Sequence, residues 1–402
     1  IILTVVINIA FAFKWILGSI LGLVHACFVH FSYLKVSMPY MDEIFHVDQT
    51  RRYCIANYSW NGKITTPPAL YLLSVPFFCG NERYINSFLI CFAFVGLCNY
   101  RRLFTSSQVF LTSILSLCLP VLFHSSILYY TDLLSLTTLL WALSSKSSLK
   151  AAIFFTLALL TRQTNIIWAG MYVLIYFIKN VDDKNLIGSI IKIFLDLWSF
   201  ILLFIAFMSF VIMNDGKIVL GDHEAHRIVP HFMQLYYFSL FVLIRKILFM
   251  PIRTFVLCGV ITVCIYCFTM DHPYLLADNR HYTFYIWRRF FLYHPSFKYL
   301  LMPIYLISLY IMKEFTVHLS PSNILLFLLS TASVLVPAHL LEPRYFIASF
   351  ILWRMALLEN RRWVLIIEFL YLLIINSLTL YLFFEKPFEW LNEPGIKQRF
   401  MW

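Results

Sequence analysis

Residues 1–31 read IILTVVINIAFAFKWILGSILGLVHACFVHF, and this apolar stretch decides the class of fold. A helix needs about 20 apolar residues to cross the hydrocarbon core of a bilayer, because its backbone polar groups must be paired inside the segment. The stretch exceeds that length and lacks the small-residue cleavage site of a signal peptide. We therefore expect a retained first membrane span, and we expect residues before Ile1 to be missing, since the chain opens without Met.

The whole sequence has the composition of a membrane protein. Of its 402 residues, 61% are hydrophobic and only 13% are charged, which excludes an ordinary soluble domain. Apolar runs recur along the chain, and none alternates with the period of two that a membrane barrel requires. The sequence predicts an all-α polytopic membrane protein with one integral membrane domain over residues 1–402. The net charge of +11 needs no nucleic acid partner, because cytosolic loops of membrane proteins are basic.

We expect about thirteen transmembrane helices, some of them short. They are placed at 1–31, 84–98, 107–128, 131–145, 151–160, 166–178, 193–213, 232–249, 254–270, 297–313, 321–341, 344–358 and 363–384. The region 151–178 has two interpretations. Its centre, residues 161–165, reads Thr-Arg-Gln-Thr-Asn, which is either a polar turn between two half-length helices or a polar patch inside one long helix.

The distribution of basic residues decides between these interpretations. With a turn at 161–165, five basic clusters fall on one side of the membrane, as the positive-inside rule expects of the cytosol. These clusters are Arg101/Arg102, Lys146/Lys150, Lys179/Lys184, Arg245/Lys246/Arg253 and Arg361/Arg362. The lumenal or exterior side then receives the loops 32–83, 214–231 and 271–296, in which we expect interfacial helices, the joint Glu342-Pro343-Arg344, and the tail 385–402.

These outer loops are themselves basic, against the usual charge rule. Their basic residues are Arg51, Arg52, Lys63, Arg162, Arg227, Arg280, Arg288, Arg289 and Arg344. A guanidinium binds two phosphate oxygens at once, so the pattern indicates an anionic ligand such as phosphate or pyrophosphate. The alternative is that these side chains reach out to lipid headgroups at the interface.

The first outer loop carries a candidate general base in the stretch Tyr40-Met-Asp-Glu-Ile-Phe-His46. Two adjacent carboxylates and a histidine just beyond a membrane span suit an enzyme that works at a bilayer surface. Neighbours on a helix point about 100° apart, so Asp42 and Glu43 are not expected to share one role. We favour Asp42 as the base, with Glu43 and His46 as a supporting pair. The alternative is that Asp42 only caps the helix.

The same loop contains two further features. Cys54 and Cys79 both lie in it, and a disulfide between them is possible, although no spacing requires one. The triplet Asn57-Tyr58-Ser59 has the form of an N-glycosylation acceptor, in agreement with an outer position for the loop.

A metal centre is the alternative chemistry for these side chains. Glu43 and His46, with His223, His226 and His231, supply enough ligand types for zinc or for two metal ions. Their spacing fits no standard site, and a phosphate group can be bound by Arg and His alone. We therefore expect neither a metal nor another cofactor.

Seven blocks of sequence, in order, resemble a known enzyme family. They are Tyr40–His46 with Gln49 and Arg52–Cys54; Trp60 with Lys63–Pro67 and Leu70-Tyr71; Thr161–Trp168; Gly221-Asp222 with His226, His231 and Gln234; His272–Arg289; Glu342–Tyr345; and Arg399–Trp402. The resemblance is to the endoplasmic reticulum dolichyl-phosphate-glucose α-1,2-glucosyltransferase family and runs nearly end to end. It implies a GT-C-type enzyme of the endoplasmic reticulum membrane with its active site facing the lumen.

The resemblance implies the substrates, and these imply the chemistry. Glucose would pass from dolichyl-phosphate-glucose to a diglucosylated dolichyl-pyrophosphate oligosaccharide, as the last step of lipid-linked oligosaccharide assembly for N-glycosylation. A β-linked donor and an α-linked product require inversion, with one carboxylate as base and preorganised donors for the departing phosphate. Our phosphate candidates are Arg280, His281 and Arg288 of the loop 271–296, with Arg344 and the loop 221–234 behind them and Arg162 as a fallback. We therefore expect 214–231 and 271–296 to be the loops that bind the donor phosphate. Other expected substrate contacts are His46, Trp60, His226, His231 and Gln234.

Two positions depart from the family pattern. Asn61 follows Trp60 where the family often has Asp, which leaves Asp42 and Glu43 as the main carboxylates of the first loop. His223 stands where a basic residue is expected after Gly221-Asp222. The rival functions are a transporter or channel and an inactive scaffold of the same fold. A transporter is disfavoured because the charges lie in outer loops and no internal repeat is visible.

Overall fold

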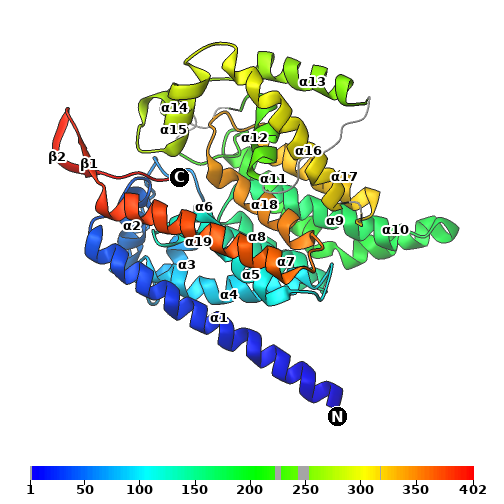
Figure 1. The fold of residues 1–402 in the computed structure, drawn as a ribbon. Helices are drawn as coiled ribbons and strands as arrows, with labels where there is room; N and C mark the ends of the chain where they lie inside the picture. The colour runs from blue at the N-terminus through cyan, green and yellow to red at the C-terminus, as the bar shows by residue number, and fades with distance from the viewer. Residues whose placement is uncertain (1, 222–227, 243–252, 317) are drawn as a thin grey trace. The chain divides into compact units, whose positions relative to one another are not determined.

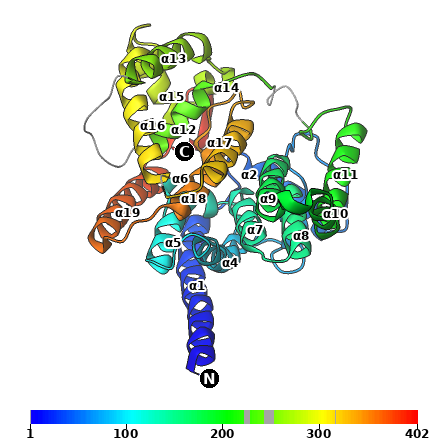
Figure 2. The same ribbon diagram turned by 90° about the vertical axis from the view of Figure 1, so that its right-hand side faces the viewer.

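The computed structural model describes residues 2–221, 228–242, 253–316 and 318–402. The chain is mostly helical and divides into two compact units. The first unit comprises Ile1–His223 and Glu359–Leu373, and the second comprises Glu224–Leu358 and Ile374–Trp402. Figures 1 and 2 show the ribbon from two sides. The expectation of one membrane domain over the whole chain stays a prediction.

The first unit is a helical bundle with short helices in its outer loop. Its elements are α1 (Ile2–Lys35), α2 (Glu43–Cys54), α3 (Ala69–Ser74), α4 (Tyr84–Arg101), α5 (Val109–Leu117), α6 (Pro120–Ser126), α7 (Asp132–Ser144), α8 (Ser148–Leu159), η1 (Gln163–Asn165), α9 (Ile166–Asn180), η2 (Asp183–Asn185), α10 (Leu186–Asp196) and α11 (Trp198–Met213), with the first half of α19 (Arg362–Glu385). Within it α1 packs on α4, α4 on α7, and α7 on α8. Both views show α1, in blue, running beside α4.

Small residues let α1 and α4 approach closely. A Cβ on Gly22 would lie 2.8 Å from the Ser87 carbonyl oxygen, and one on Gly18 would lie 3.1 Å from that of Cys91. The spacing of four places both glycines on one face of α1, which is a common way for membrane helices to pack. His25, on the same helix, lies 2.9 Å from the hydroxyls of Ser87 and Ser126. These contacts hold α1 against the bundle just before the outer loop begins.

The second unit contains the remaining helices and a small hairpin. Its elements are α12 (Met233–Val242), α13 (Arg253–Phe268), α14 (Pro273–Ala277), α15 (Tyr282–Ile286), the π-helical turn η3 (Trp287–Phe291), η4 (Phe297–Leu301), α16 (Met302–Thr316), α17 (Pro321–Leu335), η5 (Pro343–Phe346), α18 (Ile347–Ala356), and the strands β1 (Phe388–Trp390) and β2 (Glu393–Gln398). The strands are antiparallel, with Phe388 opposite Gln398. Helix α16 packs on both α12 and α13.

Most of the expected apolar segments are helical in the structure, but several differ from the prediction. Residues 243–249 of the expected span 232–249 lie outside the described residues, and the helix in the expected span 321–341 ends at Leu335. Two further segments are bent. The expected span 107–128 is broken at Pro120, where α5 and α6 meet at 65°, because proline lacks the N–H that would continue the helix. The expected span 193–213 begins inside α10 and bends by 64° between α10 and α11. Two described helical stretches, Ala12–Lys35 and Arg362–Glu385, are long and apolar enough to cross a membrane by themselves, and up to four spans result if each bent pair counts as one. The expected count of about thirteen is not confirmed.

The polar segment 161–165 is a turn. Helix α8 ends at Leu159 and α9 begins at Ile166, with the short helix η1 between them. Gln163 Nε2 donates to the carbonyl of Thr65 at 2.9 Å, so this turn contacts the first outer loop. The interpretation as two short helices is therefore confirmed, and it brings Arg162 to the same end of the bundle as the acidic motif.

Candidate active site

Helix α2 begins at the two acidic residues of the first outer loop. Met41 has a φ of +57°, in the left-handed region that non-glycine residues rarely adopt. Asp42 follows at the N-cap position, where its backbone carbonyl accepts from the N–H groups of Phe45 and His46. Its half-buried side chain makes no capping hydrogen bond. The Asp42 carboxylate therefore does not close the helix end, which disfavours the capping role as its main purpose.

Glu43, the neighbouring acid, is fully buried. One carboxylate oxygen accepts from Arg83 Nε at 2.6 Å and from the backbone N–H of Tyr129 at 2.9 Å. The other accepts from Arg83 Nη2 at 2.7 Å and from the backbone N–H of Tyr40 at 3.0 Å. A carboxylate offers about four lone-pair sites, and these contacts use all of them. Glu43 is therefore placed as an internal anchor, with no site left to take a proton from a substrate.

Arg83, which the sequence did not single out, is the partner of Glu43. Beside its two contacts with Glu43, it donates from Nη1 to the Val36 carbonyl at 2.7 Å and to the Ser32 hydroxyl at 3.3 Å, and from Nη2 to the Met38 carbonyl at 3.2 Å. All five guanidinium N–H groups thus have partners. An arginine at the boundary between an outer loop and an apolar helix was the available signal. Its pairing is long-range, so the sequence alone does not reveal it.

His46 pairs with Tyr71 rather than with Glu43. Its Nδ1 lies 2.7 Å from the Tyr71 hydroxyl, which is 3.3 Å from Thr66 Oγ1. Burial raises the pKa of the Tyr71 phenol well above its ordinary value, so this hydroxyl stays protonated. The Trp60 ring lies 6.0 Å from that of Tyr71, and its buried indole N–H has no hydrogen-bond partner among the described residues. The structure thus brings His46 and Trp60 together around one tyrosine.

Arg162 is paired with a buried carboxylate in the same unit. Its Nη2 lies 2.8 Å from Asp132 Oδ1, and its Nε donates to Thr131 Oγ1 at 3.2 Å. Asp132 is the first residue of α7 and lies three positions after Tyr129, whose backbone N–H donates to Glu43. An acid at the edge of an apolar segment is a signal that the sequence analysis passed over. Arg162 therefore already binds the Asp132 carboxylate, and a substrate anion would have to compete with it.

Two contacts fix the shape of the outer loop 32–83. A disulfide joins Cys54, at the end of α2, to Cys79, so the possibility left open by the sequence is realised. Gly221 has a φ of +65°, and a Cβ there would lie 2.4 Å from the carbonyl oxygen of Ile64 and 2.5 Å from that of Gly62. Only glycine allows this approach, so the loop 214–221 is held against the segment that follows Trp60.

In the second unit, Arg280 is engaged by Asp278. Its Nε and Nη2 donate to the two oxygens of that carboxylate at 2.8 and 2.7 Å, and its Nη1 donates to Gln398 Oε1 at 3.1 Å. Its guanidinium also lies 4.8 Å from the centre of the Trp390 ring. Burial raises the pKa of the Asp278 carboxyl, but hydrogen bonds from the side chain and backbone of Arg280 outweigh it and hold the pKa below its usual value. Arg280 thus joins the outer loop to the C-terminal tail.

The C-terminal residues pair with the same segment. The backbone N–H of Met401 donates to the Arg280 carbonyl at 2.9 Å, and the N–H of Tyr282 donates to the Met401 carbonyl at 3.2 Å. His281 Nδ1 lies 3.1 Å from the Trp402 carbonyl oxygen. The tail 399–402 is therefore hydrogen-bonded to the loop 271–296.

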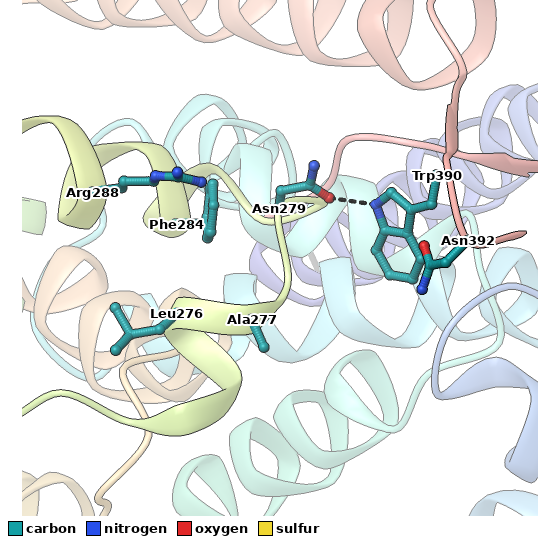
Figure 3. Close-up of a pocket in the computed structure, with 7 residues that line it drawn as sticks. All are labelled: Leu276, Ala277, Asn279, Phe284, Arg288, Trp390 and Asn392. Carbon is teal, nitrogen blue, oxygen red and sulfur yellow. Dashed lines mark hydrogen bonds between the residues drawn. The ribbon is translucent and has the colours of Figure 1, made fainter.

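An open pocket of about 310 Å³ lies between the loop 271–296 and the β1–β2 hairpin (Figure 3). Leu276, Ala277, Asn279, Phe284, Arg288, Trp390 and Asn392 line it. The Trp390 indole N–H donates to Asn279 Oδ1 at 2.7 Å, which leaves the Asn279 amide N–H groups as donors. Arg288 is exposed, with its guanidinium 5.7 Å from the centre of the Phe284 ring. The pocket therefore offers N–H donors and one positive charge.

Arg288 differs from the other phosphate candidates. No carboxylate pairs with it among the described residues, whereas Arg280 binds Asp278, Arg162 binds Asp132, and Arg344 binds Glu342 through its Nε. A second hollow, of about 480 Å³, also includes Arg288 together with Phe284, Tyr285, Arg289 and Tyr293. Arg288 is thus the candidate that is best placed to meet an external anion.

His231 and Gln234 are fully buried against the segment 338–340. His231 Nδ1 lies 3.2 and 3.1 Å from the carbonyl oxygens of Ala338 and His339, so the proton of the neutral ring sits on Nδ1. Gln234 Nε2 donates to the carbonyls of Ala338 and Leu340 at 3.1 and 3.0 Å. His231 Nε2 and Gln234 Oε1 have no partner among the described residues. Both of these atoms are hydrogen-bond acceptors.

His226 and His223 lie outside the described residues. Among the described residues, no group of three or more His, Cys, Asp or Glu side chains converges in a way that suits a metal ion.

Burial lowers the pKa of His231 below its ordinary value, although the carbonyls of His339 and Ala338 oppose this effect. The imidazole of His231 is therefore neutral at ordinary pH.

The chain is similar in sequence to proteins of one known family. The model of the DIE2/ALG10 family matches residues 36–187 and 180–355. A human protein named Dol-P-Glc:Glc(2)Man(9)GlcNAc(2)-PP-Dol alpha-1,2-glucosyltransferase is 30% identical, with 90% of this chain and 93% of the relative covered. Proteins of the same name from Drosophila melanogaster and Arabidopsis thaliana are 31% and 28% identical, covering 90% and 91% of this chain and 93% and 95% of those proteins. No solved structure matches. The chain belongs to the DIE2/ALG10 family.

Proposed function

We propose that this protein transfers glucose from dolichyl-phosphate-glucose, in α-1,2 linkage, to the diglucosylated dolichyl-pyrophosphate oligosaccharide, as the last step of lipid-linked oligosaccharide assembly for N-glycosylation. The observation that carries this proposal is the family membership over nearly the whole chain. It explains at once the apolar helices, the acidic motif at the start of α2 and the basic outer loops. The transporter or channel and the inactive scaffold are not favoured.

Asp42 is proposed as the general base. In an inverting transfer, the acceptor 2-hydroxyl attacks the anomeric carbon, the bond from that carbon to the phosphate oxygen breaks, and one carboxylate receives the hydroxyl proton. Glu43 is unsuited to this role because Arg83 and two backbone N–H groups already occupy its oxygens. Asp42 is adjacent in sequence, half-buried and not engaged in capping its helix. Glu43 would act as a positioning residue that fixes where α2 begins.

Arg288 is proposed as the first ligand of the departing dolichyl phosphate. The leaving phosphate needs no acid, but its charge must be met by fixed donors. Arg288 and the Asn279 amide supply such donors around the pocket in Figure 3, and Arg288 has no internal carboxylate among the described residues. Arg280, His281 and Arg344 support this role less directly, because each is bound within its own unit.

His231 and Gln234 are proposed as ligands of a sugar hydroxyl. Their remaining hydrogen-bonding atoms are acceptors, which attract an O–H and repel a phosphate oxygen. The backbone of 338–340 fixes both side chains in these orientations, because its carbonyls require N–H donors from each. The two residues would therefore recognise the neutral part of a substrate. This separates them in function from the arginines of the loop 271–296.

The protein is further proposed to be a GT-C-type, multi-pass enzyme of the endoplasmic reticulum membrane, with its active site in the lumen, lipids around it and no metal or other cofactor. Purified protein, dolichyl-phosphate-glucose and the diglucosylated lipid-linked acceptor test the activity. Formation of a product longer by one glucose, sensitive to α-glucosidase, is expected. Absence of product would reject the proposal, and activity lost to a chelator and restored by a divalent ion would reject the metal-free mechanism.

A further inference from the structure

The segment that follows α2 carries an N-linked acceptor sequence that the catalytic proposal does not use. Asn57-Tyr58-Ser59 is the single Asn-x-Ser/Thr triplet in the 402 residues. Asn57 and Ser59 are exposed, and Tyr58 is 71% exposed. A glycan on Asn57 would therefore point into solvent without displacing packed side chains.

Backbone geometry places the triplet outside the helix. Ala56, two residues beyond the end of α2, has a φ of +57°, and the N–H groups of Ala56 and Asn57 donate to the carbonyls of Tyr53 and Arg52 in the last turn of the helix. The Asn57 side-chain oxygen accepts from the backbone N–H of Ser59 at 3.0 Å, whereas Nδ2 of this exposed residue has no hydrogen-bond partner among the described residues. Since Nδ2 is the atom that receives an N-linked glycan, the reactive atom is presented rather than hidden.

The neighbouring disulfide gives an independent indication of the compartment. Cys54 lies three residues before Asn57 and is joined to Cys79, which closes a loop containing the whole triplet. Disulfides persist in oxidising compartments, and N-glycosylation acceptors are used on the same side of the membrane. A glycan on Asn57 would also cover apolar surface beside it, since Ile55 is 77% exposed.

We propose that Asn57 is an N-glycosylation site of this protein. A cellular oligosaccharyltransferase would bring a lipid-pyrophosphate-linked oligosaccharide. Asn57 Nδ2 would form a bond to the first sugar carbon while the bond from that carbon to the pyrophosphate oxygen breaks. Nδ2 loses one proton, and the lipid pyrophosphate departs with the bonding electrons. The proposal rests on the lumenal position that the proposed function gives to the loop 32–83.

The test is expression of the full chain in eukaryotic cells, followed by electrophoresis with and without peptide N-glycosidase. The wild type should shift downward by one step on digestion. Asn57→Gln and Ser59→Ala should migrate at the digested position, while Ser59→Thr and the matched amide control Asn61→Gln should keep the shift. An undigested wild type that already migrates with Asn57→Gln would overturn the proposal.

Two further readouts separate this proposal from the catalytic one. Glucosyl transfer by the same membranes reports the proposed function, and electrophoresis without reductant reports the Cys54–Cys79 bond. Transfer with a formed disulfide but no glycan would overturn only the Asn57 assignment. A glycan without transfer would overturn only the proposed enzyme activity. Loss of the glycan, the disulfide and transfer together would place the loop on the cytosolic side and reject both.

Discussion

Arg83 holds both carboxylate oxygens of Glu43, at 2.6 and 2.7 Å, and neither side chain is more than 2% exposed. A buried pair of this kind is worth little compared with an apolar pair, but removal of one partner leaves an uncompensated charge. Glu43 therefore stabilises the position of α2, and Asp42 is the acid of the motif that we propose as the general base.

Replacement of Asp42 by Asn should abolish most activity without unfolding the protein. The amide keeps the size of the side chain but cannot take a proton, so turnover should fall by about 10²–10⁴-fold. Donor binding and thermal stability in detergent should stay near the wild-type values. Wild-type turnover in this variant would transfer the role of base to another outer carboxylate.

Replacement of Glu43 by Gln should mainly reduce stability. Removal of one charge from a buried ion pair costs about 3–5 kcal/mol, because the Arg83 guanidinium stays buried with two of its five hydrogen bonds weakened. The double change Glu43→Met with Arg83→Met should recover part of the thermal stability. A Glu43→Gln protein that is as stable as the wild type yet inactive would make Glu43 the base.

The Arg288→Ala variant should weaken the use of the donor. Loss of a paired phosphate contact is expected to raise the KM for dolichyl-phosphate-glucose by about tenfold or more, since hydrogen bonds to charged groups are worth about 1.5–3 kcal/mol. Arg288→Lys should recover only part, because an ammonium does not reproduce the paired geometry. Arg289→Ala is the matched control and should have the smaller effect. An unchanged KM for Arg288→Ala would return Arg280 to first place.

Donor analogues with fluorine in place of one sugar hydroxyl test His231 and Gln234. Fluorine cannot donate a hydrogen bond, so an analogue altered at the recognised position should lose about tenfold in kcat/KM with the wild type. Gln234→Met should lower kcat/KM for the natural donor and abolish the difference between donor and analogue. Equal sensitivity to fluorine in wild type and variant would assign both residues to packing alone.

The Asp278–Arg280 pair should give the C-terminal tail a dependence on acid. Because the folded pKa of Asp278 lies below its ordinary value of 3.8, the stabilisation is complete above that value and is lost as the pH falls through the lower folded pKa. Proteolytic release of the tail should therefore accelerate only in strong acid. In Asp278→Asn, release should be fast and independent of pH over this range, and identical profiles for both proteins would contradict the pairing.

The polar turn at 161–165 could be predicted from the sequence alone. The rule of basic cytosolic loops favoured a turn over one long helix, and α8 and α9 are separated there. The break at Pro120 was readable as well, since proline cannot continue a helix, yet the apolar character of 107–128 concealed it. Hydrophobicity reports where a segment is buried, whereas the bend at Pro120 depends on a single missing N–H.

The pairing of charged residues was outside the reach of the sequence. Arg83 and Glu43 are 40 positions apart, and Arg162 and Asp132 are 30 apart, so no local periodicity connects them. The local rule of three and four residues suggested Glu43 with His46, which the structure replaces by His46 with Tyr71. Side chains choose partners by distance in space and by desolvation, and both arise only when the chain has folded.

The sequence by itself determined the helical class, the order of the motifs and the family, because hydrophobicity and residue identity are properties of the linear chain. Tertiary structure decided which charged side chains form ion pairs within the protein. Glu43 differs from Asp42 because it binds Arg83. Arg280 differs from Arg288 because it binds Asp278. The physical reason is that a buried charge must be compensated by a nearby partner, and only the folded chain specifies which partner lies within reach.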